Sequence, residues 1–331
     1  MCSRSTSASR RRRRGSRACA SSSRVRCPRT SERSMSDGPA LGIRPLSAAL
    51  GARIDGIDAR AELDADTVRA IRAAWLRFGL LVFRGQALDP PRLVAFTRRF
   101  GEPVVYTRAC NACDGQPEVL VLSNVVKDGK PIGAALSGRY WHTDGHYLAC
   151  PPAGTLLFGA EIPAVGGDTH FVNMTAAYRA LPAWVRTQID GRTFVMDRVQ
   201  TLPFHYPQRP APPPDQKQAW PDMPQPVVRT HPETGENALY IGGVVPWRIV
   251  GMEQRLSDAL MAHLHAIAFD EARFGYRHRW RAGDLLMWDN RCLAHRATDY
   301  DMVRHRRTMY RTTIAGDRPR YVRGAAQPGV S

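Results

Sequence analysis

The tripeptide His142-Thr143-Asp144 and one distant histidine, His295, constrain the fold of this chain most strongly. Side chains alternate in direction along an extended strand, so residues two apart point to the same face. We therefore expect His142 and Asp144 to project together from a strand, and His295 to reach them from a remote segment. Two imidazoles and one carboxylate on one face leave three positions of a metal open, as in non-haem Fe(II) oxygenases.

The net charge of +17 does not by itself indicate nucleic-acid binding, because most of it lies in one segment. Residues 1–34 contain 11 Arg and one Glu and therefore carry +10 of the total. This Arg- and Ser-rich segment has almost no large apolar side chains, so burial cannot offset the entropy of ordering it. It is either a disordered basic arm for nucleic acid or anionic lipid, or upstream sequence ahead of a true start at Met35. We favour the second explanation, since globular patterning begins only at Leu41.

From residue 35 onward the pattern is that of one domain built from short strands. Apolar runs of strand length, such as residues 80–83, alternate with turns that contain Gly or Pro. Helical periodicity is confined to four segments, residues 68–76, 90–100, 176–189 and 253–269. We expect a single domain over residues 35–331 that is mainly β with flanking helices (α+β) around a jelly-roll core.

Several motifs, taken together in their order, are more specific than the metal motif alone. They resemble the taurine dioxygenase (TauD/TfdA) family over the range from about Leu41 to Pro319. The motifs are Trp141-His142-Thr143-Asp144, Pro151-Pro152-Ala153-Gly154, Gly166-Gly167-Asp168-Thr169, Trp288-Asp289-Asn290-Arg291 through His295, and Arg306-Arg307-Thr308-Met309-Tyr310-Arg311 with Gly316-Asp317-Arg318-Pro319. The family uses Fe(II), 2-oxoglutarate and O2 on a double-stranded β-helix, so the resemblance implies this fold and these co-substrates.

The resemblance also implies roles for individual residues. The metal ligands would be His142, Asp144 and His295. Arg307 would form a bidentate ion pair with the distal carboxylate of 2-oxoglutarate, for which a guanidinium is well shaped, and Thr169 would add a hydroxyl hydrogen bond. Arg311, four residues further, would point to the same face as Arg307, near the co-substrate and the substrate.

One departure from the family concerns the pair Arg306-Arg307. The segment between His295 and this pair is one residue longer here, and alignment on Met309 and Arg311 favours Arg307 as the inward residue. Three further histidines, His146, His170 and His305, are expected to lie outside the metal site.

The substrate-facing residues are those where this chain leaves the family pattern. Gly138 stands where taurine-type members have Asn, and Tyr106 and Ala109 replace a His and a Tyr, so taurine is not expected as the substrate. The presence of Asp144 argues against halogenation, because halogenating relatives carry a small residue there. We expect the residues nearest the substrate to be Tyr106, Gly145 and Arg311. Arg108 and Arg139 are candidates for recognising an anionic group together with Arg311.

The resemblance thus implies an Fe(II)- and 2-oxoglutarate-dependent dioxygenase that oxidises a small anionic organic molecule and converts 2-oxoglutarate to succinate and CO2. The alternatives are a non-catalytic small-acid-binding member and a nucleic-acid-binding protein that uses the basic tail.

No apolar stretch is long enough for a membrane helix, and no apolar region of a signal peptide follows the arginines. We therefore expect a cytoplasmic protein with a small-molecule substrate and no specific nucleic-acid partner. A homo-oligomer is compatible with the sequence. Residues 201–226, rich in Pro and Gln, are expected to form a long loop over the pocket.

Overall fold

The computed structural model describes residues 41–106, 112–135, 137–197, 221–243 and 247–324, together with residues 199, 201, 213, 215 and 218. The predicted basic tail, Arg108 and most of the predicted loop over residues 201–226 lie outside the described residues. None of the helices in the described part of the chain is long and apolar enough to cross a membrane.

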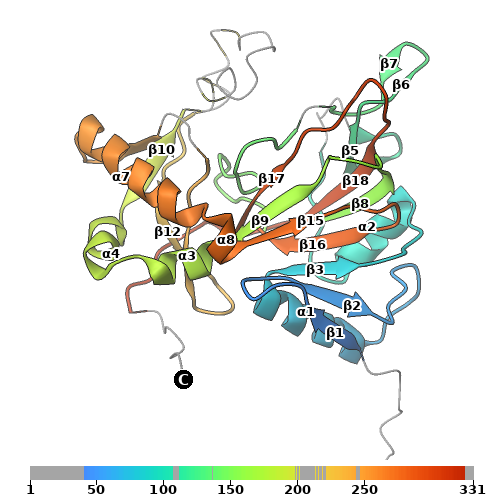
Figure 1. Ribbon diagram of the computed structural model, residues 1–331, viewed down its shortest axis with the longest axis horizontal. Helices are drawn as coiled ribbons and strands as arrows, with labels where there is room; N and C mark the ends of the chain where they lie inside the picture. Colours follow the sequence, from blue (N-terminus) through green and yellow to red (C-terminus); the bar gives the residue numbers. More distant parts are fainter. Residues whose placement is uncertain are drawn as a thin grey trace, which may run out of the picture. The chain divides into compact units, whose positions relative to one another are not determined.

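Two sheets form the centre of the domain (Figure 1). The larger sheet has the strand order β1-β2-β3-β16-β8-β18-β5-β4, and the smaller has the order β15-β9-β17. In that order, the larger sheet comprises Gly42–Pro45, Ala52–Asp55, Leu80–Phe83, Leu285–Asp289, Gly154–Glu161, Thr308–Ile314, Gln116–Ser123 and Ala112–Cys113. The smaller sheet comprises Gly275–His278, Thr169–Asn173 and Leu293–Ala297. Strands β8 and β9, and then β16, β17 and β18, alternate between the two sheets along the chain. This arrangement confirms the predicted mainly β jelly-roll fold with flanking helices.

The central strands of the larger sheet, β3 and β16, are buried on both faces, which explains their continuous apolar runs. All four residues of β3 are fully buried. Leu80 and Val82 point toward the smaller sheet and pack with Phe171 of β9, whereas Leu81 and Phe83 pack against the helices on the outer face. Every second residue of the neighbouring strands therefore faces the space between the sheets.

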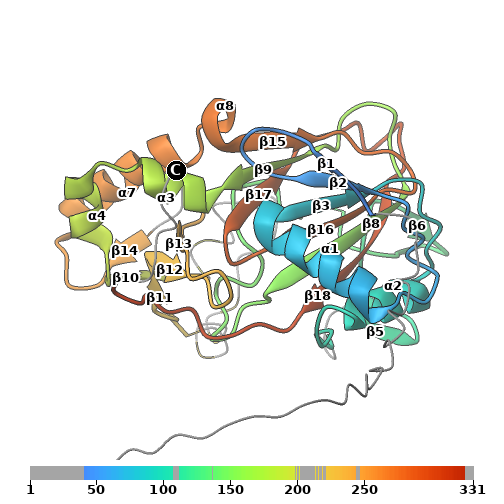
Figure 2. The same cartoon turned by 90° about the horizontal axis from the view of Figure 1, so that it is seen from below.

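Helices α1 (Ala65–Phe78) and α2 (Pro90–Arg98) cover the outer face of the larger sheet (Figure 2). Both begin at an aspartate whose side chain accepts a hydrogen bond from the first turn, Asp64 from the Thr67 amide and Asp89 from the Arg92 amide. These two helices confirm the predicted periodicity over residues 68–76 and 90–100.

A second cluster of helices and short strands lies beyond the smaller sheet and has its own apolar core. Its helices are α3 (Met174–Ala180), α4 (Ala183–Ile189), α7 (Gln254–Ala268) and α8 (Glu271–Phe274). Its strands are β10 (Thr193–Met196), β11 (Gln225–Pro226), β12 (Val228–Thr230), β13 (Asn237–Leu239) and β14 (Trp247–Ile249). A separate short hairpin is formed by β6 (Val126–Lys127) and β7 (Lys130–Pro131).

The single helix predicted over residues 176–189 was wrong, because the structure has two helices there. Leu181 is extended, with φ −66° and ψ 138°, as is usual for the residue before a proline. Pro182 is then the N-cap residue of α4. Because a proline has no amide hydrogen and a fixed φ, it prevents α3 and α4 from forming one continuous helix.

Gly154 provides a test of packing between α1 and the larger sheet. A Cβ atom at this position would lie 2.5 Å from Cζ2 and 2.9 Å from Cη2 of the buried Trp75 indole. We expect Gly154→Ala to lower the free energy of unfolding by about 1–3 kcal/mol, because overpacking a core forces side chains from their rotamers. Trp75→Phe removes those ring atoms, so the double variant should lose less stability than the sum of the two single variants. Denaturant unfolding of the four proteins measures this coupling, and strict additivity would contradict the clash.

Candidate metal centre

The segment that carries His142 and Asp144 is not the strand we predicted. His142 makes an isolated β-bridge, and Asp144 already belongs to a turn. The turn continues through Gly145, whose φ of +65° is favoured only for glycine. The two side chains therefore meet through a tight change in chain direction rather than through strand alternation.

The isolated bridge joins this segment to β17 and brings the two histidines together. The His142 amide donates to the His295 carbonyl at 3.0 Å, and the His295 amide donates to the His142 carbonyl at 2.8 Å. The two imidazole rings lie with their centroids 4.2 Å apart. The backbone therefore sets the position of both rings before any ligand binds.

The three predicted ligands converge on one point. Oδ1 of Asp144 lies 3.8 Å from Nε2 of His142 and 4.0 Å from Nε2 of His295, and one ligand atom from each residue lies within 4.8 Å of the others. Nδ1 of His142 is 2.7 Å from the Tyr140 carbonyl, so this nitrogen carries the proton and Nε2 keeps its lone pair for a metal. The donor set and spacing fit a divalent transition metal.

The protonation states of the three groups also suit metal binding. Burial lowers the pKa of His142, and burial together with the neighbouring His142 lowers that of His295 to about 3. Burial alone would raise the pKa of Asp144, but the Arg311 guanidinium and the nearby imidazoles lower it to about 2. Two neutral imidazoles and one carboxylate therefore coexist at neutral pH.

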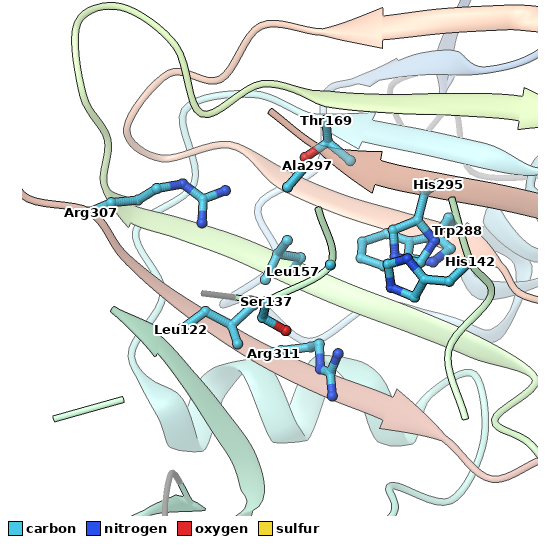
Figure 3. Close-up of a pocket in the computed structure, with 11 residues that line it drawn as sticks. Leu122, Ser137, His142, Leu157, Thr169, Trp288, His295, Ala297, Arg307 and Arg311 are labelled. Atoms are coloured by element: carbon cyan, nitrogen blue, oxygen red, sulfur yellow. The ribbon is translucent and has the colours of Figure 1, made fainter. Parts of the chain in front are cut away.

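A pocket extends from the histidines to a buried cationic end at Arg307 (Figure 3). The side chain of Arg307 lines this end of the pocket and is half-buried. Its Nε atom is shielded from solvent and has no hydrogen-bond partner among the described residues. Its Nη2 makes only a long contact of 3.4 Å with the Gly167 carbonyl, and burial lowers its pKa to about 10. The walls between the two ends include Leu122, Leu157 and Ala297.

Strand alternation explains why Arg307, and not Arg306, faces this pocket. Met309 of β18 packs between the sheets, so Arg307 and Arg311 share its face. The Arg306 side chain is 68% exposed and pairs with Glu161 on the outside. Asn124 fixes the backbone that leads into β18. Its side chain accepts a hydrogen bond from the Arg307 amide at 2.9 Å and donates to the carbonyls of Met302 and His305.

Thr169 lines the same pocket, and its hydroxyl has a defined direction. The Trp280 indole Nε1 donates to Thr169 Oγ1 at 2.9 Å. An indole nitrogen can only donate, so the Thr169 oxygen is the acceptor and its own hydrogen is available to a ligand. The structure therefore places Thr169 in the pocket, and its position beside a co-substrate stays a prediction.

The predicted substrate residues Arg311 and Gly145 adjoin Asp144, and Tyr106 contacts β18 near Arg311. Arg311 Nη1 contacts Asp144 Oδ1 at 3.2 Å, and the Tyr106 hydroxyl bonds Thr313, two residues beyond Arg311. Gly145 follows Asp144 directly, and a Cβ atom there would lie 2.5 Å from Pro152 Cδ. Arg139 does not join this group as a free cation, because it pairs with Asp299 at 2.5 Å.

The additional histidines do not enlarge the metal centre. His146 is buried with Nε2 3.2 Å from the Tyr240 carbonyl, and His170 pairs with Glu271. Neither these two nor His305 belongs to a cluster of potential ligands among the described residues.

A second group of potential ligands, His231, Asp289 and Cys292, is better explained as a hydrogen-bond network. Nδ1 of His231 accepts from the amides of Glu233 and Thr234, so Nε2 carries the proton and donates to Asp289. Asp289 is also held by the Arg291 guanidinium at 2.7 and 2.8 Å. No lone pair of His231 is left for a metal.

Sequence reasoning assigned no role to Thr155, Asn290 or Asn124. Thr155 is a polar residue within the apolar run of β8, and Asn290 follows the apolar run of β16. A polar side chain at an inward position of a buried strand was the available signal for Thr155. For Asn124 no pattern in the sequence indicated its contacts.

Comparison with known proteins agrees with this geometry. The model of the taurine catabolism dioxygenase TauD, TfdA family matches residues 42–313. The chain belongs to this family. The match covers the complete metal site, both arginines of the pocket and most of the jelly roll.

Similar proteins with curated names include two plainly related enzymes. The (S)-phenoxypropionate/alpha-ketoglutarate-dioxygenase of Sphingobium herbicidovorans is 34% identical and aligns over 84% of this chain and 96% of its own length. The alpha-ketoglutarate-dependent sulfate ester dioxygenase of Pseudomonas putida is 35% identical over 84% of this chain and 91% of its own. These names confirm the predicted enzyme class, a dioxygenase of the oxidoreductases that depends on 2-oxoglutarate.

Solved structures resemble the fold closely. A taurine dioxygenase from Burkholderia xenovorans superposes with a TM-score of 0.71 at 35% identity, over 88% of this chain and 96% of that one. The structure of AAD-2 in complex with Mn(II) and N-oxalylglycine gives a TM-score of 0.70 at 27% identity, over 84% of this chain and 98% of that one.

Proposed function

We propose that this protein uses Fe(II), 2-oxoglutarate and O2 to oxidise a small anionic organic substrate. The observation that carries the proposal is one continuous pocket with His142 and His295 at one end and Arg307, which has no carboxylate partner among the described residues, at the other. The third candidate ligand, Asp144, lies beside the two histidines. A chelating acid with a second, distal carboxylate matches both ends. Bound iron would supply O2 activation, while the protein binds and orients the reactants.

His142, Asp144 and His295 would hold the metal through Nε2, Oδ1 and Nε2. The set contains nitrogen and oxygen donors only and leaves three positions open, which suits Fe(II) with a bidentate 2-oxo acid and O2. The structure of the AAD-2 neighbour in complex with Mn(II) supports a divalent metal in a protein of this fold.

Arg307 and Thr169 would hold the distal carboxylate of 2-oxoglutarate. The Arg307 guanidinium has no carboxylate partner among the described residues, and its burial makes such a partner favourable. Thr169 has a hydroxyl hydrogen to donate. The apolar side chains between them fit the methylene groups of the acid and exclude water from the reacting end.

The substrate would lie on the side of Asp144 lined by Tyr106, Gly145 and Arg311. Relatives named for (S)-phenoxypropionate, 2,4-dichlorophenoxyacetate and sulfate esters support a substrate with a carboxylate or sulfate group. Arg311 would be the cation that positions this group, while the aromatic ring of Tyr106 offers an apolar surface. The departures at Gly138 and Tyr106 argue against taurine.

The first experiment tests the metal and the co-substrate together. Under anaerobic conditions, Fe(II) and 2-oxoglutarate added to the protein should produce a weak visible absorption band of the iron–oxo-acid chelate. His142→Ala should lose the band, because one of the three ligands is gone. The matched control is His170→Ala, which removes a histidine that pairs with Glu271 and should keep the band. If the intact protein gives no band, the iron proposal is wrong.

The second prediction separates the two adjacent arginines. Arg307→Ala should weaken 2-oxoglutarate binding about 100-fold, since each hydrogen bond to a charged group contributes about 1.5–3 kcal/mol. Arg306→Ala removes the same side chain from the exposed face and should change the affinity by less than about twofold. Titration of the Fe(II)-loaded variants with 2-oxoglutarate, followed by the chelate band, measures both constants. Equal losses in the two variants would contradict the inward position assigned to Arg307.

The third prediction concerns the substrate class. Aryloxyalkanoates and alkyl sulfates should stimulate succinate formation, whereas the uncharged methyl ester of the same aryloxyalkanoate should not, because Arg311 gains no anionic partner. Taurine should give only the background rate. Stimulation by acid and ester alike would refute anion recognition. Complete absence of substrate-stimulated and background turnover in an iron-loaded protein would favour the non-catalytic, small-acid-binding alternative.

A further inference from the structure

A buried network of hydrogen-bonded side chains contacts the Oδ2 atom of the Asp144 carboxylate. Thr155 Oγ1 lies 2.7 Å from Asp144 Oδ2, Asn290 Nδ2 lies 2.9 Å from Thr155 Oγ1, and Trp288 Nε1 lies 2.9 Å from Asn290 Oδ1. Thr155, Asn290 and Trp288 are each at most 1% exposed. Water therefore cannot replace any member of the chain.

The donor and acceptor of each hydrogen bond in this network follow from the Trp288 indole. An indole N–H can only donate, so the oxygen of the Asn290 amide faces Trp288 and its NH2 group faces Thr155. The Thr155 oxygen thus accepts a hydrogen bond from Asn290. Its own O–H must then donate to Asp144 Oδ2, because that carboxylate has no hydrogen to give.

We propose that Thr155, oriented by Asn290 and Trp288, is a positioning residue that keeps Oδ2 of Asp144 away from the metal and reserves Oδ1 for it. Oδ1 is the oxygen nearest Nε2 of both histidines. This inference rests on the proposed function, since it concerns how the same three ligands are used.

The distinction between the two oxygens has a chemical consequence. If both carboxylate oxygens bound the metal, the protein would occupy four of six octahedral positions and leave only two. A chelating 2-oxo acid needs two positions and O2 needs a third. Holding Asp144 to one oxygen therefore preserves the third position. A hydrogen bond to a ligating carboxylate also fixes its orientation, and loss of such support weakens metal binding by about 10–100-fold.

Thr155→Val tests the proposal, because valine keeps the shape of threonine and lacks the hydroxyl. We expect Co(II), titrated under anaerobic conditions and followed by its visible absorption, to bind Thr155→Val about 10–100-fold more weakly than the wild type. Thr155→Ser keeps the hydroxyl and should restore the affinity to within a few-fold.

Asn290→Asp tests the direction of the chain with almost no change in shape. A carboxylate at this position can only accept, so it would attract the hydrogen of Thr155 and turn the lone pairs of that hydroxyl toward Asp144. We expect Asn290→Asp to weaken Co(II) binding to a similar extent as Thr155→Val. The double variant should be no weaker than either single variant, since both break the same hydrogen bond.

The matched control is Thr97→Val in α2. Thr97 is also fully buried, and its hydroxyl bonds the Leu93 carbonyl and Thr312 on the outer face of the sheet. This variant should match the wild type in Co(II) affinity. Wild-type affinity in Thr155→Val, or an equal loss in Thr97→Val, would overturn the positioning role and leave the proposed function standing. If the wild type binds no Co(II), the proposed metal site and this inference fail together.

Discussion

The paired backbone hydrogen bonds between His142 and His295 are the contact on which the site depends. They attach an irregular segment after Gly138 to β17 of the smaller sheet, and both imidazoles follow from that attachment. Because β17 also pairs with β9, Thr169 is carried to the same pocket. The larger sheet supplies the other wall through β8 and β18. The bridge thus joins the segment of His142 to the smaller sheet, while the larger sheet lines the opposite side of the pocket.

Two arginines, the buried Arg291 and the half-buried Arg307, differ in how their charge is compensated. Arg291 lies against Asp289 and Glu233 and is fully compensated, so it ties the β12–β13 hairpin to the larger sheet. Arg307 has no carboxylate partner among the described residues; its guanidinium makes a long contact with the Gly167 carbonyl and lies over the Tyr300 ring. Burying an unpaired charge costs free energy, and an anionic ligand would remove that cost. Arg311 is intermediate, because its guanidinium contacts Asp144, itself one of the three candidate ligands.

Much of the fold could be predicted from the periodicity of apolar residues and from the Gly and Pro residues at turns. The apolar run at residues 80–83 became β3, and the helical period over residues 253–269 became α7. The two errors have local causes. Pro182 divides a helix whose apolar period continues across it, and Gly145 turns the chain where the His-x-Asp spacing suggested a strand. Apolar spacing reports which face is buried, and it does not report where the backbone bends.

The sequence by itself determined the family and the types and order of the candidate metal ligands, because those properties depend on which side chains are present and how far apart they lie. The family resemblance, with alignment on Met309 and Arg311, also indicated Arg307. Only the tertiary structure showed that Asn124 binds the backbone leading into β18 and that Arg139 is paired with Asp299. It also showed that Thr155 donates a hydrogen bond to Asp144 and accepts one from Asn290. These contacts join residues from distant strands, and a hydrogen bond requires distance and direction that spacing along the chain does not contain.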